Sequence, residues 1–324
     1  MYTDFYRLTG RPFQLTPDPR FYFDTATHRK AMAYLSYGLA QGEGFIIITG
    51  DIGAGKTTLV GHLMSTIDTS RLVAAKIVTT QLDAGGIVYM VASAFGVAVE
   101  GASKPEILTR LEARLRNLHA DGRRALLIVD EAQSLPIDAL EELRMLSNFQ
   151  AGTQALLQTF LLGQPEFRDK LANSNELEQL RQRVIATHHL EPMTQDEVPG
   201  YLVHRLKLCG WVGDPDFSEA AVERMFRYSG GVPRRLNSLT TRLLLFGALE
   251  QLHEIGEDAV AEVIEDLRRD QAPGTPAAGE IPVVAAIAGD PELDVRIAGV
   301  ERKIIRQERA LGQLLDLIGG DDSE

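Results

Sequence analysis

A glycine-rich stretch directly after a short apolar run carries the most specific chemical signal in the chain. The run 45–48 is rich in β-branched residues and too short for a buried helix, so it predicts an interior strand. The stretch that follows matches G-x-x-x-x-G-K-T, in which glycines let backbone N–H groups turn toward phosphate oxygens. A helix over 56–67 would add the positive end of its dipole to the same place. We therefore expect a nucleoside triphosphate to bind at Gly50, Asp51, Ile52, Gly53, Ala54, Gly55, Lys56, Thr57 and Thr58.

A later apolar run, ending in two carboxylates, supplies the matching chemistry. The run 125–129 suits a strand covered on both faces, and Asp130 and Glu131 follow it. Acidic groups at the carboxyl end of such a strand lie where ligands bind in open α/β sheets. We predict that Lys56 reaches the β- and γ-phosphates of ATP, and that Thr57 and Asp130 hold Mg²⁺, Asp130 through the water shell of the ion. Glu131 would polarise the attacking water. Alone, an Asp-Glu pair after a strand is typical of a solvated helix start, but the phosphate loop favours the catalytic role.

Three further polar residues lie next to predicted strands. Gln164 follows the predicted strand 155–162 and could sit beside the γ-phosphate as a sensor, or it could be a turn residue that bonds its own backbone. Arg181 and Arg183 precede the predicted strand 184–190, and both could form salt bridges on the surface.

The elements that would position these residues alternate along the chain. Strands are predicted at 45–48, 72–78, 125–129, 155–162 and 184–190, with helices between them at 56–67, 85–95, from Ser103 through Leu118, and at 140–149. The pattern predicts an α/β fold, a parallel five-stranded sheet flanked by helices. Helices at 194–208, 218–228, 236–249 and 258–267 then form a small all-helical module.

The expected domain boundaries follow from these patterns. We assign 1–44 to an N-terminal Pro/aromatic segment that packs on the ATPase core, 45–191 to the nucleotide-binding domain, and 192–270 to the helical lid. The aromatics of the first segment suit either plain core or a wall near the nucleotide base. Residues 271–291 are a Pro-, Ala- and Gly-rich linker, and 292–319 carry a heptad-like seam that predicts a short coiled coil. The alternative for that seam is a helix folded back on the body.

Composition narrows the classes of function. Formal net charge is −12 and the isoelectric point is about 5.1, which disfavours nucleic acid as a partner, although local arginine pairs exist. The single cysteine, Cys209, excludes an internal disulfide and is expected to be a buried thiol. The N-terminus has no leader pattern, and no apolar run approaches the ~20 residues of a membrane span. A cytoplasmic protein is expected.

Taken together, residues 1–270 resemble an AAA+ ATPase, and within that group the ExeA/GspA-type secretion ATPases. The matching motifs lie at 12–21, 50–58, 129–133, 140–148 and 163–167. The chain looks most similar to the branch associated with PEP-CTERM/exosortase (XrtA) exopolysaccharide systems. The resemblance implies that Gln164 or Asn148 is sensor 1, that Arg183 is an arginine finger reaching a neighbouring subunit, and that Arg234 is sensor 2 on the lid.

The function implied by this resemblance is oligomerisation-dependent hydrolysis of ATP to ADP and phosphate. The protein would be a switch or assembly factor for exopolysaccharide production or protein export. It would form a homo-oligomer and contact an envelope partner that holds it at the inner membrane. Longer ExeA-type proteins continue into a membrane span and a peptidoglycan-binding part, whereas a linker and a short coiled coil are predicted here. Their own anchoring and direct contact with the envelope are therefore not expected of this chain, and the expected contact is through a protein partner. Two alternatives are a DNA-binding transposition regulator of the TniB/MuB type and a nucleotide-loaded scaffold that hardly turns over.

Overall fold

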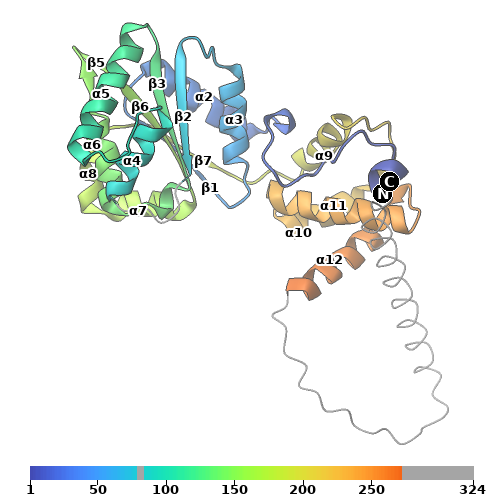
Figure 1. Cartoon of the computed structure of the whole chain (residues 1–324). Helices are drawn as coiled ribbons and strands as arrows, with labels where there is room; N and C mark the ends of the chain where they lie inside the picture. Colours follow the sequence, from blue (N-terminus) through green and yellow to red (C-terminus); the bar gives the residue numbers. More distant parts are fainter. Residues whose placement is uncertain (79–83, 272–324) are drawn as a thin grey trace, which may run out of the picture. The chain divides into compact units, whose positions relative to one another are not determined.

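A computed structural model describes residues 1–78 and 84–271 (Figure 1). The predicted coiled coil, and all of the predicted linker except Gln271, lie outside the described residues. The described residues belong to one compact unit.

Five parallel strands form the central sheet. They are β1 (Phe45–Gly50), β2 (Leu72–Val78), β3 (Arg124–Asp130), β6 (Leu157–Gly163) and β7 (Val184–Leu190). Their order across the sheet is β2-β3-β6-β1-β7, with every neighbouring pair parallel. The prediction of a parallel five-stranded sheet is confirmed. Because β1, β3 and β6 are adjacent, their carboxyl ends bring the phosphate loop, the carboxylates and Gln164 to one edge.

Helices cover both faces of this sheet, as Figure 1 shows. One face packs against α2 (Ala26–Gln41) and α3 (Lys56–Thr66), which meet the Ile46 and Ile48 side chains of β1. The other face packs against the helices that follow β2, and it receives Phe45 and Ile47. These helices are α4 (Ala84–Ala94), α5 (Lys104–Ala120), α6 (Ile137–Leu146), α7 (Pro165–Asn173) and α8 (Glu178–Arg181). Burial on two faces explains why the central strands are continuously apolar.

The helices after β7 form an apolar cluster of their own, called the helical cluster below. It contains α9 (Glu197–Lys207), α10 (Glu219–Ser229), α11 (Pro233–Leu249) and α12 (Glu257–Gln271), with a short parallel pair, β8 (Asp216–Phe217) and β9 (Glu254–Ile255), beside them. The buried thiol of Cys209 lies in this cluster, and burial raises its pKa.

Only part of the N-terminal segment packs on the ATPase core, where all of it was expected to do so. It contains α1 (Tyr2–Phe5) and the short η1 turn (Pro19–Phe21). Tyr6, Leu8, Phe13 and Phe21 are buried in the helical cluster instead. Those side chains need an apolar surface, and the lid helices α9 and α11 supply one. The η1 turn contacts α3, where Tyr22 stacks on His62, and α2 packs against the sheet.

Several element boundaries also differ from the predictions. Helix α6 begins at Ile137 and ends at Leu146, and a two-stranded hairpin, β4 (Gln150–Ala151) with β5 (Gln154–Ala155), precedes β6. Helix α11 begins at Pro233 rather than 236, because proline is well suited to the first helical position. The remaining short turns are η2 (Ala132–Ser134) and η3 (Asn175–Leu177). Within the described ranges, no helix combines the length and apolar character that a bilayer crossing needs.

Candidate functional site

The phosphate loop joins the end of β1 to the start of α3. Gly53 has a φ of 85° and Gly55 a φ of 97°, backbone conformations that side chains other than glycine rarely adopt. Gly55 is the N-cap of α3, and its carbonyl accepts the N–H of Leu59 at 2.8 Å. The turn therefore gathers N–H groups at a helix N-terminus, the arrangement that binds anions.

Lys56 is held inside this loop. It is 7% exposed, and its Nζ donates to the carbonyls of Gly50 at 2.7 Å and of Asp51 at 3.0 Å. Burial lowers the pKa of Lys56, while the negative charges of Glu131 and Asp130 act in the opposite direction. The ammonium is therefore placed on the loop where phosphate oxygens would replace the carbonyls.

Helix α11 of the helical module contacts the same loop. The N–H of Arg234, at the start of α11, donates to the carbonyl of Gly53 at 3.2 Å. A Cβ on Gly53 would lie 2.3 Å from the Cβ of Arg234, so only glycine allows this approach. The predicted lid residue Arg234 thus lies directly against the phosphate loop.

The carboxylate Asp130 faces α3. Its Oδ2 accepts the hydroxyl of Thr57 at 3.0 Å and lies 3.0 Å from the Nζ of Lys76 on β2. A hydroxyl and a carboxylate converge there, and hard oxygen ligands of this kind suit Mg²⁺. Thr57 and Asp130 therefore fit the predicted metal role. Lys76 was not predicted; a lone lysine inside the apolar strand 72–78 is the signal that could have identified it.

Glu131 is oriented by two side-chain amides. Its φ of 58° is uncommon for a residue other than glycine, and strain of this sort clusters at functional sites. Its Oε2 accepts from Gln133 Nε2 at 2.5 Å and from Gln164 Nε2 at 3.2 Å. The N–H of Gln164 in turn donates to Gln133 Oε1 at 3.0 Å. Gln164 therefore joins β6 to the carboxylate of β3.

The remaining predicted residues lie elsewhere. Asn148 is exposed and hydrogen-bonds the guanidinium of Arg183, which also donates to Ser147 Oγ at 2.9 Å. The carbonyl of Arg183 accepts the N–H of Phe45 at 3.0 Å, at the amino end of β1. The phosphate loop follows the carboxyl end, about 20 Å away for a strand of this length. The structure thus brings Gln164, and not Asn148, to Glu131.

Arg181 has a different environment from Arg183. Its Nη1 donates to the carbonyls of Leu171, Ala172 and Ser174 at 2.5, 3.2 and 2.8 Å. These are carbonyls at the end of α7, which an arginine is well suited to cap. Arg181 therefore holds the end of this helix.

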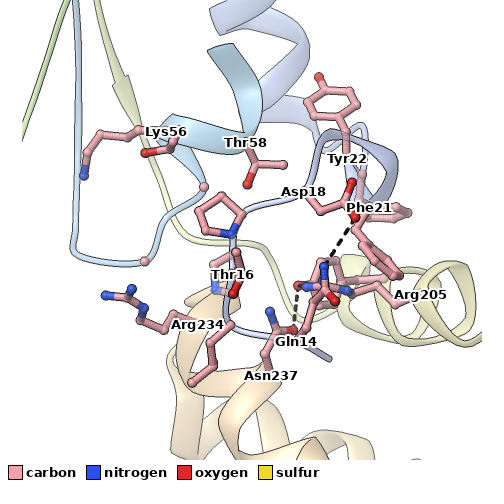
Figure 2. A pocket seen from close by; sticks show the side chains of 18 of the residues that line it. Gln14, Thr16, Asp18, Phe21, Tyr22, Lys56, Thr58, Arg205, Arg234 and Asn237 are labelled. Carbon is pink, nitrogen blue, oxygen red and sulfur yellow. Dashed lines mark hydrogen bonds between the residues drawn. The ribbon is translucent and has the colours of Figure 1, made fainter. Parts of the chain in front are cut away.

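A pocket opens beside the loop between the helical cluster and the N-terminal segment (Figure 2). Glu131 and most of the phosphate loop (Ile52, Gly53 and residues 55–58) line one part, and Arg234 and Asn237 line the lid part. The N-terminal segment contributes Phe21 and Tyr22, so its aromatics serve both as core and as pocket wall.

A buried polar chain closes the lid side of this pocket. Arg205 is 6% exposed, and its Nη1 donates to Tyr201 Oη at 2.7 Å. That hydroxyl donates to Asn237 Oδ1, also at 2.7 Å. The guanidinium also lies over the ring of Phe21, 4.6 Å from its centroid, and close to Phe13. Cation–π contacts offset part of the cost of burying this charge.

Comparisons with known proteins agree with this arrangement. Residues 39–171 match the family described as AAA domain. General secretion pathway protein A of Aeromonas hydrophila is 35% identical over 257 residues, which are 79% of this chain and 46% of that protein. The chain therefore spans about half the length of this curated relative.

Two solved structures share the fold. Cdc6p from Pyrobaculum aerophilum has a TM-score of 0.60 at 17% identity, over 78% of this chain and 71% of that one. The ORC2 protein of Aeropyrum pernix has a TM-score of 0.59 at 17% identity, over 79% and 71% of the two chains. At such identities the likeness establishes the P-loop fold.

Proposed function

We propose that this chain, an AAA-family protein related to general secretion pathway protein A, binds ATP with Mg²⁺ beside the phosphate loop and hydrolyses it to ADP and phosphate. The observation that carries this proposal is the convergence of groups from three adjacent strands. The phosphate loop follows β1, Asp130 is the last residue of β3 with Glu131 directly after it, and Gln164 directly follows β6.

Each side chain has a chemical part in the proposed reaction. Lys56 and the loop N–H groups bind the phosphates, and Thr57 with Asp130 would hold Mg²⁺, which when bound neutralises phosphate charge. Glu131 takes a proton from water as the water oxygen bonds to the γ-phosphorus and the bond to the β-phosphate oxygen breaks. Gln133 and Gln164 hold the carboxylate of Glu131 in place.

Replacing Glu131 tests this assignment. Glu131→Gln keeps the shape and removes the base, so we expect ATP binding near the wild-type level and turnover lowered by about 10²-fold or more. Lys56→Ala should instead weaken ATP binding. Gln164→Ala should lower turnover because its side-chain amide contacts Glu131, whereas Gln195→Ala, at an exposed glutamine outside the site, is the matched control and should keep wild-type turnover. Full turnover by Glu131→Gln would remove Glu131 from the catalytic role.

We further propose that hydrolysis drives a switch or assembly factor in protein export or exopolysaccharide production of the PEP-CTERM/exosortase type. The name of the Aeromonas relative supports export, and the motif resemblance supports the polysaccharide branch. Contact with the inner membrane would then come through a protein partner. Deletion of the gene should reduce surface polysaccharide or exported protein, restored by wild type and not by Glu131→Gln. Hydrolysis stimulated by DNA would instead support the transposition-type regulator.

A further inference from the structure

His28 lies against the phosphate loop although it comes from another part of the chain. It occupies the first turn of α2, is 6% exposed and lines the pocket. Its Nε2 lies 3.0 Å from the position that a Cβ on Gly55 would occupy. Gly55 is the N-cap of α3, so this ring nitrogen reaches the point where the loop becomes the helix.

The hydrogen bonds of Thr25 fix the proton on the ring. The Oγ1 of Thr25 accepts the backbone N–H of His28 at 3.2 Å and lies 2.6 Å from its Nδ1. Thr25 is 2% exposed, and within the described chain these are the partners shown for its hydroxyl. A buried hydroxyl hydrogen needs an acceptor, and Nδ1 is the one in reach. Nδ1 therefore accepts, and Nε2 carries the hydrogen.

The ring of His28 also packs against an aromatic side chain. The ring of Tyr22 meets His28 edge-on, with centroids 5.8 Å apart, and stacks on His62 at 3.9 Å. No described residue is shown as a hydrogen-bond partner of His28 Nε2. His28 lines the pocket and its Nε2 lies beside Gly55, so a ligand in the pocket can accept this N–H.

We propose that His28 is a nucleotide-binding residue whose Nε2–H donates to a phosphate oxygen of the bound nucleotide. The inference rests on the proposed function, since it names a further ligand-binding group of that site. A neutral ring adds a directed donor beside the loop N–H groups without a second cation next to Lys56. Burial lowers the pKa of His28 to about 4, which agrees with a neutral ring at physiological pH. Asp24 and Glu197 act against this shift, and His188 adds to it.

Binding measurements on matched variants test the donor. His28→Phe keeps a ring without a donor, and His28→Gln keeps an N–H at similar reach. We expect ATP affinity to fall about ten-fold or more in His28→Phe and much less in His28→Gln, because a bond to a charged acceptor is lost only in the first. His62→Phe, which changes the other ring against Tyr22, should match wild type. Equal affinities of wild type and His28→Phe would overturn the proposal.

Two further measurements separate the donor role from a structural one. In full-length protein labelled with ¹⁵N-histidine and assigned with His28→Gln, Nε2 should be the protonated nitrogen and its resonance should move when ATP is added. Tripolyphosphate should show the same loss as ATP in His28→Phe. A protonated Nδ1, an unmoved Nε2, or a loss seen with ATP and not with tripolyphosphate would contradict the inference. Failure of wild type to bind ATP at all would contradict the proposed function itself.

Discussion

At the scale of single residues, sequence motifs identify the groups that would act on the nucleotide, whereas the groups that contact them are identified only from the structure. Lys56, Thr57, Asp130 and Glu131 follow from local patterns, because strand, glycine turn and helix are contiguous in sequence. Lys76 acts through its place on a neighbouring strand, opposite Ile128 in the register. Pairing between strands is not written in any single stretch of sequence, so this contact could not be predicted.

Lys76 should compete with the metal. Its ammonium and the hydroxyl of Thr57 share Asp130 Oδ2, and the lysine side chain is 40% exposed. In Lys76→Met we expect the Mg²⁺ concentration for half-maximal ATP binding to fall a few-fold, since a competing cation is removed and a half-exposed pair contributes at most about 1 kcal/mol. A fluorescent ATP analogue titrated with Mg²⁺ measures this. Lys104→Met, which breaks a similarly exposed pair with Glu142, should change nothing. A higher Mg²⁺ requirement in Lys76→Met would show that the lysine assists metal binding.

His28 should also make stability fall in mild acid. Its pKa is about 4 in the folded protein and 6.5 in the unfolded chain, so between these values the unfolded state binds the extra proton. This contribution is present above pH 6.5 and is lost as pH falls toward 4, by up to about 3 kcal/mol. Urea unfolding at pH 7, 6 and 5 measures it. His28→Gln should show a shallower decline over this interval, and identical slopes would contradict the buried neutral state.

At the scale of elements, continuous apolar runs made the strands predictable, whereas the role of the N-terminal segment was not. Residues 11–23 carry prolines that disfavour a regular helix, and so provide no periodicity from which a partner could be inferred. Phe13 illustrates this. It is 1% exposed and lies among lid residues such as Leu206 and Leu239, far along the sequence.

Truncating Phe13 should therefore destabilise the helical cluster. For Phe13→Ala we expect a loss of about 3–5 kcal/mol in the free energy of unfolding, because a fully buried ring is replaced by a cavity. Chemical denaturation followed by circular dichroism measures it. Leu15→Ala, two residues away and 56% exposed, should stay within about 0.5 kcal/mol of wild type. Comparable losses in both variants would mean that the segment is not anchored by its buried aromatics.

At the scale of the whole molecule, the order of helices and strands predicted the α/β sheet with its helical module, and this was confirmed. The lateral order of the strands could not be derived from the chain, because it depends on how crossovers place each strand. The direction of the strands separates the two arginines: Arg234 lies on the phosphate loop, which follows the carboxyl end of β1, and Arg183 lies at the amino end of the same strand. An arginine at the amino end of the strands is too far from the phosphate loop of its own chain, so it could contact a nucleotide only in a neighbouring subunit.

If Arg183 acts in this way, hydrolysis should depend on assembly. We expect specific activity to rise steeply with protein concentration, and Arg183→Ala to lower turnover by about 100-fold or more with ATP affinity nearly unchanged, since an arginine supplied in trans contributes about 10³–10⁵ in enzymes that use one. Steady-state hydrolysis and analytical ultracentrifugation measure both. Arg181→Ala should instead lower stability, because it caps α7. Equal activity per protomer in monomer and oligomer would reject the shared site.

Because Tyr6, Phe13 and Phe21 are buried among α9 to α12, the helical cluster cannot finish folding until the C-terminal helices have been synthesised. During synthesis these aromatics leave the ribosome before the sheet, and the helices that bury them leave after it. Contacts between such distant segments form slowly and leave apolar surface exposed in the meantime. Deleting residues 1–21 should therefore give a protein whose phosphate loop is intact in sequence but whose helical module aggregates as it is made.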